Sequence, residues 1–184
     1  MKRGRIFWMV VCLAVILSLF LSIPSYAKTA QEINGEVNEA LKLFSQQVKG
    51  GKEFLNTSKG VLVIPNIVKA GLGVGGQYGE GALRIGGKTV DYYSIAAGSA
   101  GLQIGAQKMN LILVFMQDEA LKTFRASSGW KAGVDASVAF VDVGAEKSLD
   151  TAKIKDPIVG FVFGQKGAMA AATVEGGKFT KLVR

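Results

Sequence analysis

The segment from Gly71 to Gly87, GLGVGGQYGEGALRIGG, shapes the architecture more than any other part of the chain. Up to Gly81, glycine or another small residue falls at nearly every second position, the period at which side chains return to the same face of a strand. Glycine inside a strand is unfavourable, so its repetition indicates strong curvature or close packing against another backbone. Gly86-Gly87 indicates a turn. We therefore expect residues 72–85 to form a curved strand that ends in a turn.

Short apolar or alternating runs on both sides of this segment predict further strands. The run at 60–64 is closed by Pro65, and the run at 111–116 is wholly apolar, which is typical of a strand buried on both faces. The other predicted strands are 89–97, 101–107, 130–143, 166–174 and 178–183. The sequence thus predicts a sheet of about nine strands, mostly antiparallel, rich in glycine and curved.

Two helices are predicted beside the sheet. An amphipathic helix at 29–48 carries apolar residues at steps of three or four, namely Ile33, Val37, Leu41, Phe44 and Val48. Thr29 and Glu32 have the spacing of a capping box, and the acidic polar face favours packing against the sheet over lying on a membrane. A short helix at 118–126 would turn Leu121 and Phe124 inward. The predicted fold class is α+β, a single domain dominated by its sheet.

The first 27 residues have the organisation of a secretory signal peptide. Lys2, Arg3 and Arg5 precede an apolar run at 6–23, and small residues precede a cleavage site after Ala27. The alternative is an uncleaved membrane anchor, because 18 apolar residues are just long enough to span a bilayer. We expect residues 28–184 to form one exported domain, periplasmic or extracellular, associated with a membrane.

The composition excludes several kinds of catalysis. The chain has no histidine, and its one cysteine, Cys12, lies in the predicted signal peptide, which excludes Ser-His-Asp and Cys-His catalysis and zinc sites built from these residues. The spelling G-x-G-x-x-G from Gly71, with Asp91 twenty residues later, does not run into a helix as a dinucleotide site requires. Asp118-Glu119 is better explained as a helix start than as a catalytic pair. We predict no catalytic, cofactor-binding or metal-ligating residues and no enzyme activity.

Residues 28–184 contain 19 basic and 14 acidic residues, and their formal net charge of +5 suits an anionic partner such as a phospholipid surface. Basic residues beside glycine-rich backbone could hold headgroups, and Trp130 could insert at the interface. The candidate binding residues are Lys59, Lys69, Arg84, Lys108, Trp130 and Lys131. The alternative is that these cations are scattered, solvent-facing charges.

A small outer-membrane β-barrel is a further alternative, because such proteins are exported, lack cysteine and alternate along their strands. The run at 111–116 does not alternate, and tyrosine and tryptophan are too few for two aromatic girdles. The sequence therefore favours a domain with a packed core.

A series of ordered motifs resembles the SYLF domain along nearly all of residues 28–184. They are Lys59-Gly60-Val61-Leu62-Val63-Ile64-Pro65, Lys69-Ala70-Gly71, Gly75-Gly76, Gly79-x-Gly81, Ser99-x-Gly101-Leu102-Gln103-x-Gly105-Ala106-Gln107, the run at 111–116, Ala120-Leu121-x-x-Phe124, Gly129-Trp130-x-x-Gly133, Lys166-Gly167 and Glu175-Gly176. Members of this family bind phosphoinositides in eukaryotes, and in yeast also actin; bacterial members are exported proteins or lipoproteins.

The resemblance implies binding of anionic phospholipid without catalysis, at a membrane surface in the cell envelope. We expect no cofactor and no nucleic acid, and actin is not an expected partner of an exported protein of bacterial type. The alternative is a structural or scaffolding envelope protein that binds another protein.

Overall fold

A single long β-hairpin forms the centre of the structure, a computed structural model that describes residues 28–143, 156–164, 174 and 176–184. Its strands, β1 (Gly60–Ile85) and β2 (Lys88–Phe115), pair antiparallel along almost their whole length. The turn between them is Gly86-Gly87, where the φ angles are 57° and 79°, values that glycine adopts without strain. The predicted turn is therefore confirmed.

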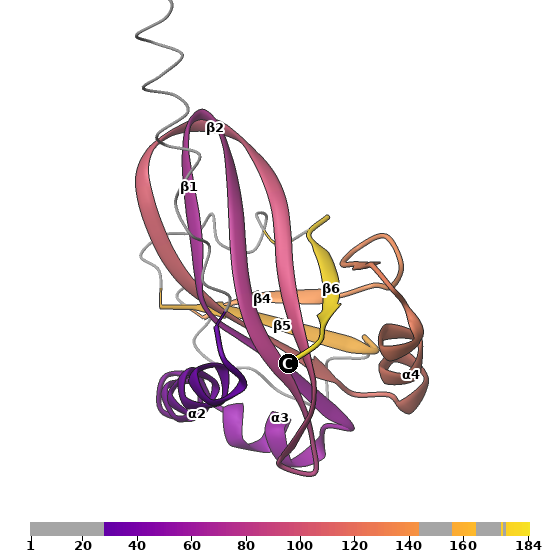
Figure 1. The fold of residues 1–184 in the computed structure, drawn as a ribbon. Helices are drawn as coiled ribbons and strands as arrows, with labels where there is room; N and C mark the ends of the chain where they lie inside the picture. Colours follow the sequence, from indigo (N-terminus) through magenta and orange to yellow (C-terminus); the bar gives the residue numbers. More distant parts are fainter. Residues whose placement is uncertain (1–27, 144–155, 165–173, 175) are drawn as a thin grey trace, which may run out of the picture.

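The hairpin bends over on itself, so that its two halves lie face to face (Figure 1). Around the bend glycine stands opposite glycine in the register: Gly71 faces Gly105, Gly73 faces Gly101 and Gly76 faces Gly98. Beyond it, Gly79 and Gly81 lie against residues 63–67 of the first half. A Cβ atom at Gly81 would lie only 2.7 Å from the Cα atom of Ile64. The glycines thus permit both the curvature and the close backbone packing that the sequence predicted.

Each half of the hairpin carries further strands. Residues 92–96 of β2 pair with β6 (Lys178–Leu182), and residues 110–115 pair with β5 (Ile158–Phe163). β3 (Trp130–Lys131) lies antiparallel to β6, whereas β4 (Ala139–Asp142) lies parallel to β5. The described residues therefore form one curled, mostly antiparallel sheet of six strands.

Two apolar clusters hold this sheet in shape. The first fills the space between the two halves of the hairpin and includes Leu62, Ile95, Leu111 and Phe179. α4 (Asp118–Ala126) closes it with Leu121 and Phe124. The second lies under the helices α2 (Ala30–Gln47) and α3 (Gly51–Thr57). There the rings of Phe44 and Phe54 meet Phe161 of β5 edge-on, with centroids 4.9 and 5.0 Å apart.

The start of α2 confirms the predicted capping box. The amide of Glu32 donates to Thr29 Oγ1 at 3.2 Å, and the amide of Thr29 donates to Glu32 Oε2 at 2.7 Å. Two backbone donors that the helix cannot satisfy internally are thereby paired. The apolar stripe of α2 packs on the sheet, as its acidic outer face indicated.

The predicted α+β class with a dominant sheet is confirmed, but several predicted strand boundaries were wrong. Residues 60–64 and 72–85 merge into β1, and the three runs predicted between 89 and 116 merge into β2. The one strand expected at 166–174 lies outside the described residues except for Val174, which is in a turn. β5 and α3 were not predicted at all.

The strand predicted at 130–143 is interrupted by a turn and survives only as β3 and β4. Gly133 has a positive φ angle of 75°, and its amide donates to the carbonyl of Ala136. The carboxylate of Asp135 accepts a hydrogen bond from the amide of Lys131 at 2.6 Å. Local turn chemistry therefore overrides the alternating pattern in this segment.

Candidate functional site

A pocket of about 410 Å³ opens where α2, α3 and the turn of the central hairpin meet. Leu41 of α2, Leu55 of α3 and Val61 of β1 form its apolar wall. The rest of the lining consists of Asn56, Ser58, Arg84, Gly86 and Gly87. We call it the Arg84 pocket. It combines an apolar surface with one cationic side chain, the combination that an amphiphilic anion requires.

The guanidinium of Arg84 is poorly satisfied by the protein. Its Nη2 atom donates to Asn38 Oδ1 at 2.7 Å, whereas its Nε atom is buried and has no hydrogen-bond partner among the described residues. No carboxylate in the described part of the chain forms an ion pair with it. Burial lowers the pKa of Arg84, yet an arginine remains protonated at any physiological pH. The pocket therefore holds a permanent positive charge whose counter-charge the described residues do not supply.

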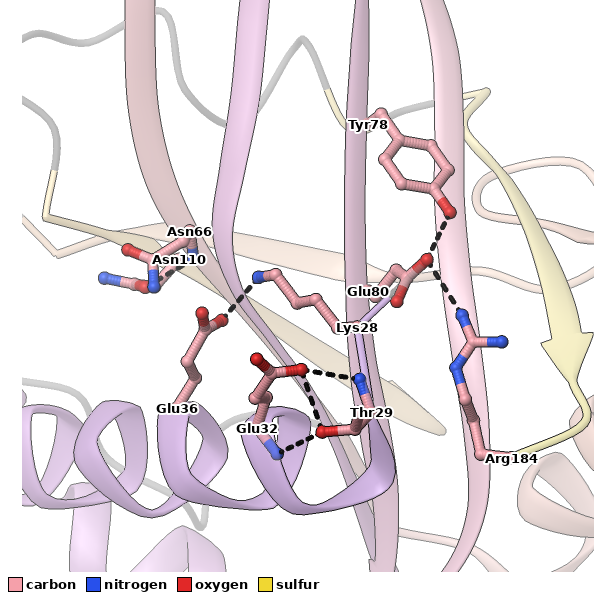
Figure 2. A network of polar contacts seen from close by, with 9 residues as sticks. All are labelled: Lys28, Thr29, Glu32, Glu36, Asn66, Tyr78, Glu80, Asn110 and Arg184. Atoms are coloured by element: carbon pink, nitrogen blue, oxygen red, sulfur yellow. Dashed lines mark hydrogen bonds and ion pairs between the residues drawn. The ribbon is translucent and has the colours of Figure 1, made fainter. Parts of the chain in front are cut away.

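The other described arginines, and some of the lysines, have carboxylate partners, and Figure 2 shows this for Arg184 and Lys28. Arg184 Nη2 lies 3.0 Å from Glu80 Oε1, and Lys28 Nζ lies 2.7 Å from Glu36 Oε2. The hydroxyl of Tyr78 also donates to Glu80 Oε1, at 2.7 Å. Burial opposes ionisation of Glu80, but these hydrogen bonds outweigh it and the pKa of Glu80 is lowered. This network holds Arg184 against β1. Both of its cations, Arg184 and Lys28, are paired with carboxylates.

The predicted binding residues do not form one cluster. Lys59 is exposed at the same end of the hairpin as Arg84, with its Nζ atom 3.8 Å from Asp118 Oδ2. Lys69 is only 5% exposed and shares the inner face of the bent hairpin with Ile67. Lys108 is exposed on the opposite face from Lys69, since it pairs with Val68 in the register. The structure thus places Lys59 near Arg84 and separates the other two lysines from it.

Trp130 and Lys131 also lie away from the Arg84 pocket. Trp130 is 1% exposed and packs edge-on against Phe124 and Phe179, with ring centroids 5.3 and 5.5 Å apart. A ring buried in this core has no surface with which to enter a membrane interface, so that part of the prediction does not fit the structure. Lys131 is exposed on the edge strand β3.

A second charged pocket, which the sequence did not reveal, lies between α4 and β6. Asp91 of β2 accepts from Arg125 Nε at 2.9 Å and pairs with Lys181 Nζ at 2.6 Å. Burial would raise the pKa of Asp91, but the contacts with Lys181 and Arg125 lower it. The pairing of β6 with β2 and the packing of α4 beside them bring these three residues together, so no local signal in the sequence marks them.

The described ranges contain neither a candidate metal site nor a candidate membrane-spanning helix. No group of three or more acidic, histidine or cysteine side chains there is arranged to hold a metal ion. None of the helices α2, α3 and α4 has the length and apolarity needed to cross a bilayer.

Fold and pocket together define a sheet-dominated α+β domain with a cationic, partly apolar pocket. Residues 96–182, from within β2 to the end of β6, match the family model described as Ysc84, Las17-binding protein actin regulator. The match covers a little under half of the chain, and it confirms the resemblance to the SYLF domain. That description names a binding protein. No curated protein matches the chain.

Proposed function

We propose that this protein binds anionic phospholipid, without catalysis, at a membrane surface in the cell envelope. The observation that carries the proposal is the guanidinium of Arg84, which faces an apolar-walled pocket and lacks a carboxylate partner among the described residues. A phosphodiester oxygen would supply the missing acceptor, and lipid carbon atoms next to the headgroup would lie against Leu41 and Leu55.

Exposed lysines around the pocket support the same orientation toward a membrane. Lys52 on α3, Lys59 before β1 and Lys88 after the turn are all exposed. In Figure 1, α3 and the hairpin turn lie at the lower end of the molecule. Each basic residue near an anionic surface contributes on the order of 1 kcal/mol to binding. Long-range attraction would therefore bring this end of the molecule to the membrane before the pocket is filled.

The proposed location in the envelope rests on the sequence of residues 1–27, which lie outside the described residues. We propose that they direct export and are removed after Ala27, with retention as an anchor as the alternative. The domain used in solution is then residues 28–184.

Sedimentation with vesicles tests the proposal. Residues 28–184 should sediment with vesicles of phosphatidylcholine and phosphatidylglycerol, less so at high salt, and should stay in solution with phosphatidylcholine alone. Arg84→Gln should weaken the binding about 10- to 150-fold, because a charge-assisted hydrogen bond contributes about 1.5–3 kcal/mol. Lys108→Gln removes the same charge far from the pocket and is the matched control. Equal binding to both kinds of vesicle would contradict the proposal.

The family description favours a second candidate, the binding of a protein partner through the same end of the molecule. Envelope proteins captured by the wild-type domain but lost with Arg84→Gln, in the absence of any vesicle binding, would favour this candidate over lipid.

A further inference from the structure

The pocket between α4 and β6 has the features of an anion site in its own right. It encloses about 510 Å³ and is lined by Asp118, Leu121, Lys122, Arg125, Ala126 and Lys181. We call it the α4 pocket. The three cations of this lining face Asp91, which pairs with Arg125 and Lys181, and Glu119, whose Oε2 lies 3.9 Å from Lys122 Nζ. The third carboxylate, Asp118 in the wall, pairs with a fourth cation, Lys59, at 3.8 Å. The balance of charge in the pocket is positive.

Asp91 fixes the positions of Arg125 and Lys181, and its single negative charge does not neutralise both of them. Its side chain is 9% exposed and contacts only Nε of Arg125 and Nζ of Lys181 in the ion pairs that it forms. A guanidinium has five N–H donors and an ammonium three, so both groups keep donors for another acceptor. Charged groups that are already held in place lose less conformational freedom when they bind a ligand. The arrangement is therefore pre-organised for a multivalent acceptor such as a phosphate group.

The α4 pocket and the Arg84 pocket lie at the same end of the molecule. Gly60, at the start of β1, separates them: a Cβ atom there would lie 3.0 Å from the side chain of Leu121 and 3.4 Å from the carbonyl oxygen of Arg84. Leu121 lines one pocket and Arg84 lines the other. In Figure 1 the hairpin turn, α3 and α4 all lie toward the lower end of the molecule.

We propose that the α4 pocket is a second headgroup site, so that one molecule holds two anionic phospholipids in the same membrane surface. This inference rests on the proposed function and adds to it the number of lipids and the residues of the second site. Two linked sites bind a surface far more tightly than either alone, because the second event is intramolecular. The protein would then respond to the density of anionic lipid and not merely to its presence.

Titration calorimetry with a short-chain, water-soluble phosphatidylglycerol tests the number of sites. We expect two equivalents to bind residues 28–184, and one equivalent to bind either Arg84→Gln or Lys181→Gln. Lys178→Gln, on the same strand but outside the pocket, is the matched control and should keep both sites. Lys122→Gln leaves the contacts of Asp91 intact and should weaken only the second site, which separates loss of ligand from loss of folding.

Vesicles provide an independent readout. Binding of the wild-type domain should rise roughly as the square of the anionic lipid fraction, and binding of Lys181→Gln roughly linearly, with an affinity at least about tenfold lower. One equivalent in the wild-type titration, with Lys181→Gln unchanged, would overturn the second site and leave the proposed function standing. No binding by the wild type in either assay would overturn both.

Discussion

Replacing Gly81 by alanine should destabilise the fold strongly, because two layers of backbone meet at this position. The added Cβ atom would collide with the carbonyl oxygen of Val63 and lie 2.7 Å from Ile64 Cα and 2.8 Å from the carbonyl carbon of Val63. Non-bonded carbon atoms prefer about 3.5–4.0 Å, so the two halves of the hairpin would have to separate by roughly 1 Å. Overpacking of this kind costs about 1–3 kcal/mol and occasionally more.

We expect the upper end of that range, since backbone atoms of paired strands cannot turn aside as a side chain can. For a chain of this size, about 3 kcal/mol corresponds to a fall in Tm of about 6–12 °C. Thermal and urea unfolding of residues 28–184, followed by circular dichroism, would measure the change.

Two glycines near the bend provide matched controls. A Cβ atom at Gly76 would meet nothing closer than the carbonyl oxygen of Ala97 at 3.7 Å, and one at Gly98 would meet nothing within 4 Å. Alanine at either position should leave the stability unchanged or raise it by about 0.4–1 kcal/mol through the unfolded chain. If Gly81→Ala were as stable as Gly98→Ala, the two halves of the hairpin would not pack as described.

Three further predictions concern local interactions. Thr29→Ala removes the capping box and should lower the free energy of unfolding by about 1 kcal/mol, measured by urea denaturation. The pKa of Asp91 is lowered, so its ion pairs stabilise the fold above the unfolded-state pKa and are lost as the pH falls through the folded-state pKa. Asp91→Asn should therefore make the unfolding free energy less dependent on pH below about pH 4. The same pH dependence in Asp91→Asn and in the wild type would contradict this. Burial, followed by the hydrogen bond to Glu80, raises the pKa of Tyr78 to about 12, and burial raises the pKa of Tyr93 to about 12. An absorbance titration should show both phenols ionising late, and Tyr78→Phe should remove one of these late steps.

Local signals in the sequence were sufficient for α2 and for the bend. The spacing of the apolar residues in α2 and its capping box act within a few residues of one another, so the sequence alone specifies them. Gly79 and Gly81 share one face of β1, and their close contact with residues 63–67 is the backbone packing that such a pattern indicates.

Long-range pairing explains where the sequence misled. Glycines around residues 71–76 and 98–105 suggested breaks between short strands, but they pair with each other across the hairpin and keep both strands continuous. The bulge between Ile64 and Ile67 shifts the alternation, which places Lys69 on the buried face. Helix α3 starts directly after Gly50, a position that the sequence indicated only as the end of a helix.

The candidate site was partly predictable. Arg84 was one of six candidate residues, chosen as a cation in a glycine-rich part of the sequence, and the structure places it in a pocket. Arg125 and Lys181 come from separate elements and meet only on Asp91, so their proximity depends on how β6 and α4 pack against β2. Trp130 shows the converse: its position beside basic residues suggested a membrane contact, but its neighbours in space are the rings of the core.

Hydrogen–deuterium exchange on vesicles would test most directly which part of the molecule meets the lipid. When residues 28–184 bind vesicles that contain phosphatidylglycerol, amides of α3, of the turn at Gly86-Gly87 and of α4 should exchange more slowly than in solution. Amides at the bent end of the hairpin, around Gly76 and Gly98, should exchange at the same rate in both states. Slower exchange confined to the bent end, with α3 and α4 unchanged, would contradict the assignment of the membrane-facing surface.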